Sequence, residues 1–300
     1  MQPHDPALVT RIYDLPNTPN RIQKLEAAVQ KQWLASGWYQ RAILRDVENN
    51  AVAVNRLDLE AQVWALISGV AQRQATEAAL LATVETQLDT PSPIGGALTV
   101  GGAVWPAISQ LLTWGYLRSG RADLAWRSFN RHTFAVHSTF YPDMWLNTWS
   151  GPDGINGTAA GTAAGGTWAS PLTPMQDFPV MNANQDSMAL LALIRLAGIE
   201  PARAGDGLRI APSIPRDRWT LVTRLLTLEV EPGRIAGRYN AIANGSRSLY
   251  MRVPVGASAV QAWVDGQPVA DAVLDAEGDI VLRITFTAEQ SVGFEVRFTV

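Results

Sequence analysis

Apolar positions follow two different periods along this chain. Between about residues 21 and 198 they recur every three or four positions, which is the spacing of the buried face of a helix. The stretches with this spacing are residues 22–33, 57–70, 76–88, 105–117, 122–136 and 187–196. Gly120 is placed as a helix stop and Ser187 follows a helix-start signal. The pattern therefore predicts six helices joined as hairpins.

The remainder of the chain alternates between apolar and polar positions. Period-two alternation predicts half-buried antiparallel strands over residues 249–255, 280–286 and 292–300. Asp265 and Gly266 form a two-residue hairpin signal between two such runs. We therefore expect an α+β chain of two domains, with a helical part over residues 1–200 and a C-terminal antiparallel β-sandwich over residues 201–300.

One long irregular stretch, about residues 139–184, interrupts the helical part. It is rich in Gly, Ala, Thr, Pro and Trp, and residues 151–166 are close to low complexity. Structureless loops of this length are uncommon inside compact domains, and they are usually functional. We expect this loop to carry part of any active site and residues 151–166 to be mobile.

Composition narrows the classes of function. The 300 residues are 47% hydrophobic and 17% charged, with a formal net charge of -3 and scattered basic residues. This balance fits a globular protein and gives no reason to expect a nucleic acid or a membrane surface as partner. The chain has no Cys, its first residues do not resemble a signal peptide, and no apolar run is long enough to cross a bilayer. We expect a cytoplasmic protein without a cofactor.

Histidine gives no metal site by sequence. His132 and His137 are five positions apart, and no His-Glu-x-x-His motif is present. We therefore expect these two residues to be structural or surface side chains.

Tryptophan is the unusual residue of this composition. The chain has eleven Trp against six Tyr and seven Phe, and nine of the eleven fall between Trp33 and Trp168. Core packing is the simplest explanation for any single one. Sugar rings, however, stack on indole while carboxylates and amides bind their hydroxyls. We expect Trp105, Trp145 and Trp149 to be stacking platforms.

The long loop also offers a pair of carboxylates. Asp143, Asn147 and Asp153 lie within or beside its Trp-rich part. Glycoside hydrolysis needs two carboxyl groups, one that protonates the leaving oxygen and one that activates water or attacks. Asp143 and Asp153 are the catalytic candidates, and Asn147 is a candidate sugar contact. Both aspartates could equally serve to cap turns.

A second polar group precedes and opens the helix expected at residues 57–70. Arg41, Asp46 and Gln62 are candidate contacts for sugar hydroxyls. Asp58 and Glu60 can be ordinary first-turn acids that the helix dipole favours. Gln62 stands between apolar neighbours, and a buried amide needs hydrogen-bond partners.

Three motifs, in the right order, resemble the C-terminal part of the (α/α)6-barrel glycosidases and glycoside phosphorylases, most closely the cellobiose/chitobiose phosphorylase family (glycoside hydrolase family 94). Residues 38–42, Trp-Tyr-Gln-Arg-Ala, resemble its Tyr-x-Arg-Ala strand. Residues 62–69 resemble its Gln-x-Trp-x-x-x-Ser-Gly helix. Residues 207–215, Gly-Leu-Arg-Ile-Ala-Pro-Ser-Ile-Pro, resemble the segment that opens its C-terminal sandwich. The resemblance implies half of an (α/α)6 toroid, an oligosaccharide substrate and glycosidase chemistry.

The chain departs from that family in two places. The Asp-Trp-Asn-Asp segment that carries the family's general acid has no counterpart before Trp38, and the complete barrel has about twelve helices. The resemblance therefore implies a missing N-terminal half as partner. The phosphorylases also carry Glu-Asn-Gly-Gly-x-x-x-His, whereas residues 99–106 here lack both the Glu and the phosphate-binding His. We expect a glycoside hydrolase, with a phosphorylase and a non-catalytic carbohydrate-binding or remnant module as alternatives.

Overall fold

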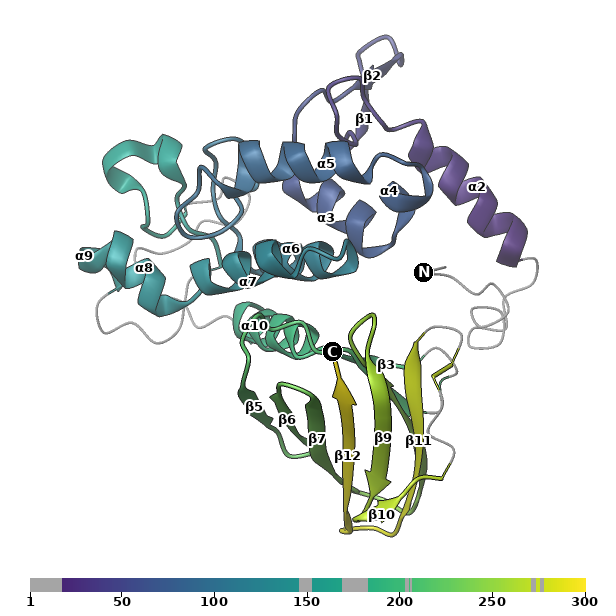
Figure 1. Cartoon of the computed structure of the whole chain (residues 1–300). Coiled ribbons are helices and arrows are strands. Elements are labelled where there is room, and N and C mark those ends of the chain that lie inside the picture. Colours follow the sequence, from purple (N-terminus) through teal and green to yellow (C-terminus); the bar gives the residue numbers. More distant parts are fainter. Residues whose placement is uncertain are drawn as a thin grey trace. The chain divides into compact units, whose positions relative to one another are not determined.

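A computed structural model of the chain describes residues 18–145, 153–168, 183–202, 205, 207–270, 274–275 and 278–300. The chain forms two compact units, Met1–Leu193 and Ile194–Val300 (Figure 1). The division falls within helix α10, a few residues before the predicted domain boundary. Among the described helices, none is both long and apolar enough to cross a membrane.

Unit 1 is helical, apart from a short hairpin and several turns. Its elements are α2 (Thr18–Gln30), β1 (Ile43–Arg45), β2 (Ala51–Ala53), α3 (Leu59–Ile67), α4 (Val70–Arg73), α5 (Glu77–Val84) with a π-helical continuation (Glu85–Asp89), α6 (Pro106–Arg118), α7 (Ala122–Arg131), α8 (Phe134–Phe140), α9 (Pro142–Trp145), a 3₁₀ helix (Thr158–Ala163) and α10 (Ala183–Leu196). Each of the six stretches with helical spacing contains a helix.

Two of the expected helices are broken, and each break has a local cause. The first ends before Gly69, whose φ of 71° is left-handed. The second ends at His132, and Thr133 begins α8 because its hydroxyl accepts a hydrogen bond from the backbone N–H of Val136. Gly120, with φ 71°, separates α6 from α7 as its sequence position predicts.

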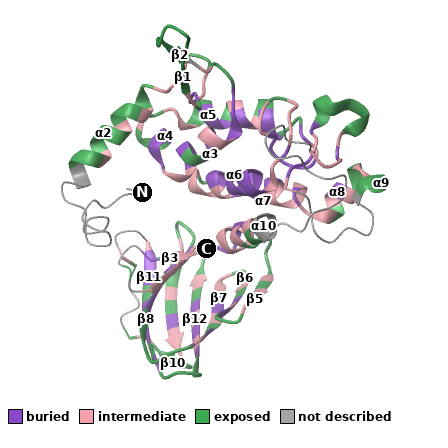
Figure 2. Ribbon diagram, turned by 180° about the vertical axis from the view of Figure 1, so that it is seen from behind, coloured by how far each residue is buried: buried purple, intermediate pink, exposed green. Residues whose placement is uncertain are grey.

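Helix α6 lies at the centre of unit 1. It packs against both α3 and α7, and buried side chains occur almost all round it (Figure 2). On a helix that is buried on nearly every side, each polar side chain needs a hydrogen-bond partner within the protein. Thr113 satisfies this condition, because its hydroxyl donates to that of Ser128 on α7.

Unit 2 contains two sheets. Its strands are β3 (Ile199–Pro201), β4 (Gly207–Ile210), β5 (Trp219–Val222), β6 (Leu226–Glu231), β7 (Arg234–Asn240), β8 (Gly245–Arg252), β9 (Ser258–Val264), β10 (Gln267–Pro268), β11 (Asp279–Phe286) and β12 (Ser291–Thr299). The six-stranded sheet has the order β10-β9-β12-β7-β6-β5 and the four-stranded sheet the order β11-β8-β4-β3. Buried side chains of both sheets form one hydrophobic core, including Leu249, Ile284 and Val296.

The strand alternation read from the sequence is confirmed within the strands and ends outside them. Leu249 and Met251 are buried within β8, and Val253, one residue past its end, is still buried, but Val255, three residues past the end, is 99% exposed. Val300, directly after β12, is 80% exposed. The expected alternation is wrong at these two positions.

One strand pair is parallel, whereas the sequence predicted an antiparallel arrangement. Strands β4 and β8 run in the same direction, although the other described pairs in unit 2 are antiparallel. Between them the chain crosses to the other sheet and forms β5 to β7, so no tight turn fixes their relative direction. The predicted hairpin at Asp265 and Gly266 is confirmed: both have positive φ, and they join β9 to β10.

Candidate functional site

Three segments that are distant in sequence lie side by side at one end of unit 1. Ile155 forms antiparallel bridges with Val104 on one side and Thr167 on the other. Val104 and Ile155 exchange two backbone hydrogen bonds, both 2.8 Å. Ile155 is fully buried, and it packs in a small core with Ile94. We call residues 103–105, 153–157 and 165–168 the arch.

The arch brings together two of the residues singled out in the sequence. Trp105 follows Val104 and is the N-cap residue of α6, and Asp153 lies two residues before Ile155. The indole Nε1–H of Trp105 donates to Oδ1 of Asp153 at 3.0 Å. Both side chains are half-buried, so the pair stands at the surface on a fixed backbone frame.

A second indole contacts the same segment. Trp168 lies directly against the backbone of Gly154: a Cβ on Gly154 would come within 2.7 Å of Cε3 of Trp168. Trp168 is half-buried, and its backbone N–H donates to the carbonyl of Gly154. The sequence did not single out Trp168, because its closeness to Gly154 arises only from the bridge between Ile155 and Thr167.

Helix α9, which carries Asp143, also lies against the arch, since a Cβ on Gly166 would lie 3.4 Å from Cε of Met144 on α9. Tyr141, directly before α9, adds a second contact. The ring of Tyr141 covers Gly165, where a Cβ would lie 2.2 Å from the ring, and Gly165 has a left-handed φ of 83°. Burial raises the pKa of the Tyr141 hydroxyl above its ordinary value. Asp143 itself is exposed on the first turn of α9. The two candidate carboxylates therefore belong to one region of unit 1.

The arch continues into the Gly101–Gly102 turn. Ala159 N–H donates to the carbonyl of Gly101 at 2.8 Å, and Gly102 N–H donates to the carbonyl of Thr99. The glycine pair thus serves as a backbone contact between the turn and the 3₁₀ helix.

Gln62 occupies the centre of a different contact. Its amide is fully buried; it accepts from the N–H of Tyr39 at 2.9 Å and donates to the carbonyls of Tyr39 and Asp58, both at 2.8 Å. The two motifs at residues 38–42 and 62–69 are thereby joined. A contact of Gln62 with a sugar hydroxyl stays a prediction.

Arg41 and Asp46, the other two candidates before helix α3, are both exposed. Arg41 forms ion pairs with Glu60 at 2.7 Å and with Asp58 at 3.7 Å. Asp46 lies in the turn between β1 and β2, where hydrogen bonds from the backbone and side chain of Asn50 lower the pKa of its carboxyl. The structure does not bring either residue into the arch.

The remaining candidates lie outside the described part of the chain. Asn147 and Trp149 are there, as is the side chain of Trp145. Among the residues that are described, no group of three His, Asp or Glu side chains is placed to hold a metal ion.

Comparison with known proteins gives a likeness of fold only. No family model matches the sequence, and no curated protein matches it. Solved structures similar to the chain are glycoside hydrolases. They include a GH127 β-L-arabinofuranosidase from Geobacillus stearothermophilus T6 (12% identity, 80% of this chain and 42% of that chain, TM-score 0.30). An α-L-rhamnosidase from Dictyoglumus thermophilum shares 12% identity over 97% of this chain and 30% of that chain, with a TM-score of 0.42.

A third structure, described as a glycoside hydrolase, shares 13% identity over 97% of this chain and 54% of that chain, with a TM-score of 0.31. The chain thus spans between 30% and 54% of the length of these three proteins. With TM-scores below 0.5, the toroid, the sandwich and the affinity to family 94 stay predictions.

Proposed function

We propose that the chain is the C-terminal part of a glycoside hydrolase, with half of an (α/α)6 toroid followed by a β-sandwich, and that the arch binds the oligosaccharide. One observation carries this proposal: an indole and a carboxylate, Trp105 and Asp153, are hydrogen-bonded to each other at the surface of a rigid backbone frame. That pairing of an apolar ring face with an acceptor is what a sugar ring and its hydroxyls require.

The frame explains why such a site would be selective. The bridges at Val104 and Ile155 fix the backbone of both segments, and the indole N–H fixes the rotamer of Asp153. Trp168 adds a second ring, packed against the backbone of Gly154, the residue that follows Asp153. A preorganised site loses little conformational entropy when a ligand binds.

The chemistry is assigned to Asp143. An exposed carboxylate next to the arch can accept a proton from water that attacks the anomeric carbon, whereas Asp153, bonded to an indole, holds the sugar. A general acid for the leaving oxygen comes from outside this chain in the proposal. Trp145, Asn147 and Trp149 are proposed as further sugar contacts. Arg41, Asp46 and Gln62 lie outside the arch, and their contacts with a sugar stay predictions from the sequence.

The binding part of the proposal is tested by isothermal titration of the chain with gluco-, xylo- and arabino-oligosaccharides. Trp105→Phe keeps an aromatic ring but removes the N–H, and Asp153→Asn removes the charge. We expect each to weaken binding roughly tenfold or more, the scale of a hydrogen bond to a charged group. The matched controls, Trp64→Phe and Asp217→Asn, change exposed residues outside the arch and should leave binding unchanged. If no sugar binds, or if the arch variants bind as the parent does, the proposal fails.

The catalytic part needs a substrate that requires no acid. A dinitrophenyl glycoside has a leaving group that departs without a proton, so its hydrolysis by the chain reports the base alone. We expect Asp143→Asn to lower this hydrolysis about a hundredfold, within the usual range for a general base, while sugar binding persists. Unchanged hydrolysis in Asp143→Asn, or no hydrolysis by the parent chain, would show that Asp143 is not the base.

A further inference from the structure

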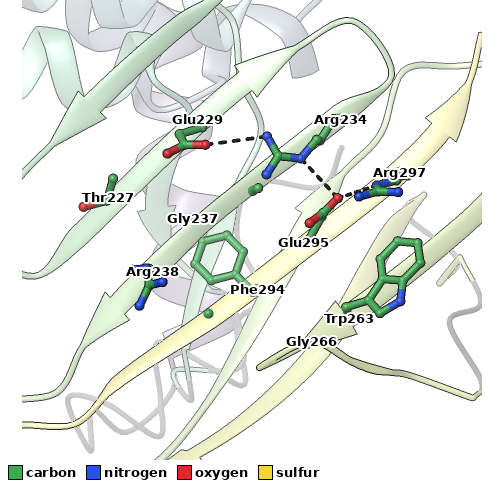
Figure 3. A pocket seen from close by; sticks show the side chains of 12 residues that line it. Thr227, Glu229, Arg234, Gly237, Arg238, Trp263, Gly266, Phe294, Glu295 and Arg297 are labelled. Carbon is green, nitrogen blue, oxygen red and sulfur yellow. Dashed lines mark hydrogen bonds and ion pairs between the residues drawn. The ribbon is translucent and has the colours of Figure 1, made fainter.

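The six-stranded sheet of unit 2 carries a pocket that the proposed function does not use. Its volume is about 620 Å³, within the range of small-molecule sites, and it lies over β6, β7, β12 and β9 (Figure 3). Its lining includes Glu229, Arg234, Arg238, Trp263, Gly293 and Glu295.

Small residues form the floor of this pocket. Gly293 on β12 pairs with Arg238 on β7, and Ala236 pairs with Glu295. A Cβ added to Gly293 would meet only Asp265 Oδ1, at 3.5 Å, which is ordinary contact. Gly293 therefore leaves open space in the lining of the pocket, and Arg238 and Trp263 are among the larger residues that line it (Figure 3).

One wall is a chain of ion pairs across three strands. Arg234 on β7 pairs with Glu229 at 3.5 Å and with Glu295 at 3.1 Å, and Glu295 also pairs with Arg297. Glu231 adds a further partner to Arg234 at 3.1 Å. The carboxylates of this wall are thus already matched by cations, and they can still accept hydrogen bonds from hydroxyl groups.

Arg238 is different from the other two arginines of the pocket. It is exposed, and within the described residues no carboxylate lies at ion-pair distance from it. Arg238 is therefore the arginine of the lining whose charge no described carboxylate neutralises through an ion pair. A guanidinium is suited to bind a carboxylate through two parallel hydrogen bonds.

An indole completes the site on the far side. Trp263 on β9 is half-buried, pairs with Glu295 across the strands, and has the Arg297 guanidinium 5.1 Å from its ring centroid. Trp263 lies on β9 and Arg238 on β7, with β12 between them. Two strand spacings put these two strands about 10 Å apart. A ligand over Gly293 would touch an aromatic ring at one end and a cation at the other.

We propose that this pocket binds a saccharide that carries a carboxylate, with the sugar ring beside Trp263 and over Gly293 and the carboxylate on Arg238. The site belongs to unit 2 and involves no bond making or breaking. It is separate from the arch, whose residues are in unit 1, so either assignment can fail without the other.

Isothermal titration of the chain with trigalacturonate tests the proposal, and the fully methyl-esterified trigalacturonate is the matched probe because it keeps the sugars but not the charges. We expect the acid to bind at least tenfold more tightly than the ester, and Arg238→Gln to remove that difference. Gly293→Val adds bulk to the floor without removing a polar group, and it should abolish binding of both probes. Arg283→Gln, an exposed arginine on the other sheet, is the control.

The other outcomes overturn the proposal. The proposal fails if trigalacturonate does not bind, or if the acid and the ester bind equally well. It also fails if sulfate, a bare anion, binds as tightly as trigalacturonate, or if Arg238→Gln and Gly293→Val both bind as the parent does. Thermal unfolding of each variant shows that a loss of binding is not a loss of fold. Asp153→Asn and Trp105→Phe should leave trigalacturonate binding to this pocket intact, which separates it from the arch.

Discussion

Each of the two units contains a buried aspartate held by two arginines, and the two clusters are built differently. In unit 1, Asp89 is fully buried and bonds to Arg127 at 3.1 Å and Arg131 at 3.2 Å. In unit 2, Asp279 is 3% exposed and bonds to Arg209 at 3.0 Å and to Arg252. The partners of Asp89 come from one helix, α7, whereas those of Asp279 come from two strands, β4 and β8.

The difference lies in what else holds the partners. Strands β4, β8 and β11 are already joined by backbone hydrogen bonds, so Asp279 reinforces a ladder. Asp89 joins elements that share no ladder, since it ends the π-helical turn after α5 and also accepts a hydrogen bond from the Tyr116 hydroxyl on α6 at 3.1 Å. Burial and the nearby Asp89 charge raise the pKa of that hydroxyl far above its ordinary value. Unit 1 therefore depends on its side-chain cluster more than unit 2 does.

Removing Asp89 should have the largest effect on stability. Asp89→Ala leaves the buried Tyr116 hydroxyl without its acceptor and removes the buried carboxylate from both arginines, so that Arg127 keeps Glu85 and Arg131 keeps the backbone carbonyl at position 89. Breaking a buried pair in this way costs about 3–5 kcal/mol. Denaturant unfolding with hydrogen exchange should show the loss in α5, α6 and α7. The control is Asp123→Ala, which removes an exposed pair with Arg121 and should cost less than about 1 kcal/mol. Equal losses would show that the cluster is not a joint between helices.

Acid should weaken unit 1 selectively. Burial lowers the pKa of His132 to about 3 and that of His137 to about 4, and all three histidines of the chain precede residue 194. Because the unfolded chain binds protons below about pH 6.5 and the folded chain does not, stability falls as the pH drops below that value. Between pH 6.5 and 5 each histidine contributes a loss of about 2 kcal/mol.

Urea unfolding at several pH values, followed by hydrogen exchange in each unit, measures this effect. In unit 1, His132→Phe should roughly halve the slope of the free energy of unfolding against pH, whatever the substitution does to stability at pH 7. Unit 2, which has no histidine, provides the internal control. A slope of equal size in both units would contradict the assignment to the buried histidines.

Asp279→Ala should cost less than Asp89→Ala, about 2–3 kcal/mol, since the strands that carry Asp279 and its two arginines keep their backbone pairings. The loss should appear in hydrogen exchange along β11 and β8. Asp217→Ala, an exposed residue of the same unit, is the control. A larger loss than that of Asp89→Ala would reverse the comparison between the units.

The periods along the chain predicted the helices and strands because those depend on local spacing. Side-chain pairings could not be predicted in the same way. Asp279 and Arg209 are 70 positions apart, and Trp105 and Asp153 are 48 apart, so nothing local signals either contact. Arg209 belongs to a motif that suggested a family, and the structure shows what the arginine does there: it bonds to a buried aspartate.

Gln62 is a third buried polar side chain that joins separate segments. Its amide bonds to backbone groups, whereas Asp89 and Asp279 bond mainly to side chains. Gln62→Ala removes the acceptor of the Tyr39 N–H and the donor to the Tyr39 carbonyl, in a fully buried position. We expect a loss of about 1–2 kcal/mol. Hydrogen exchange should rise at Tyr39, while exposed Gln72→Ala on α4 changes nothing. If exchange rises instead throughout α3 and α6, Gln62 supports the whole core, and the tie between the two motifs is not its main contribution.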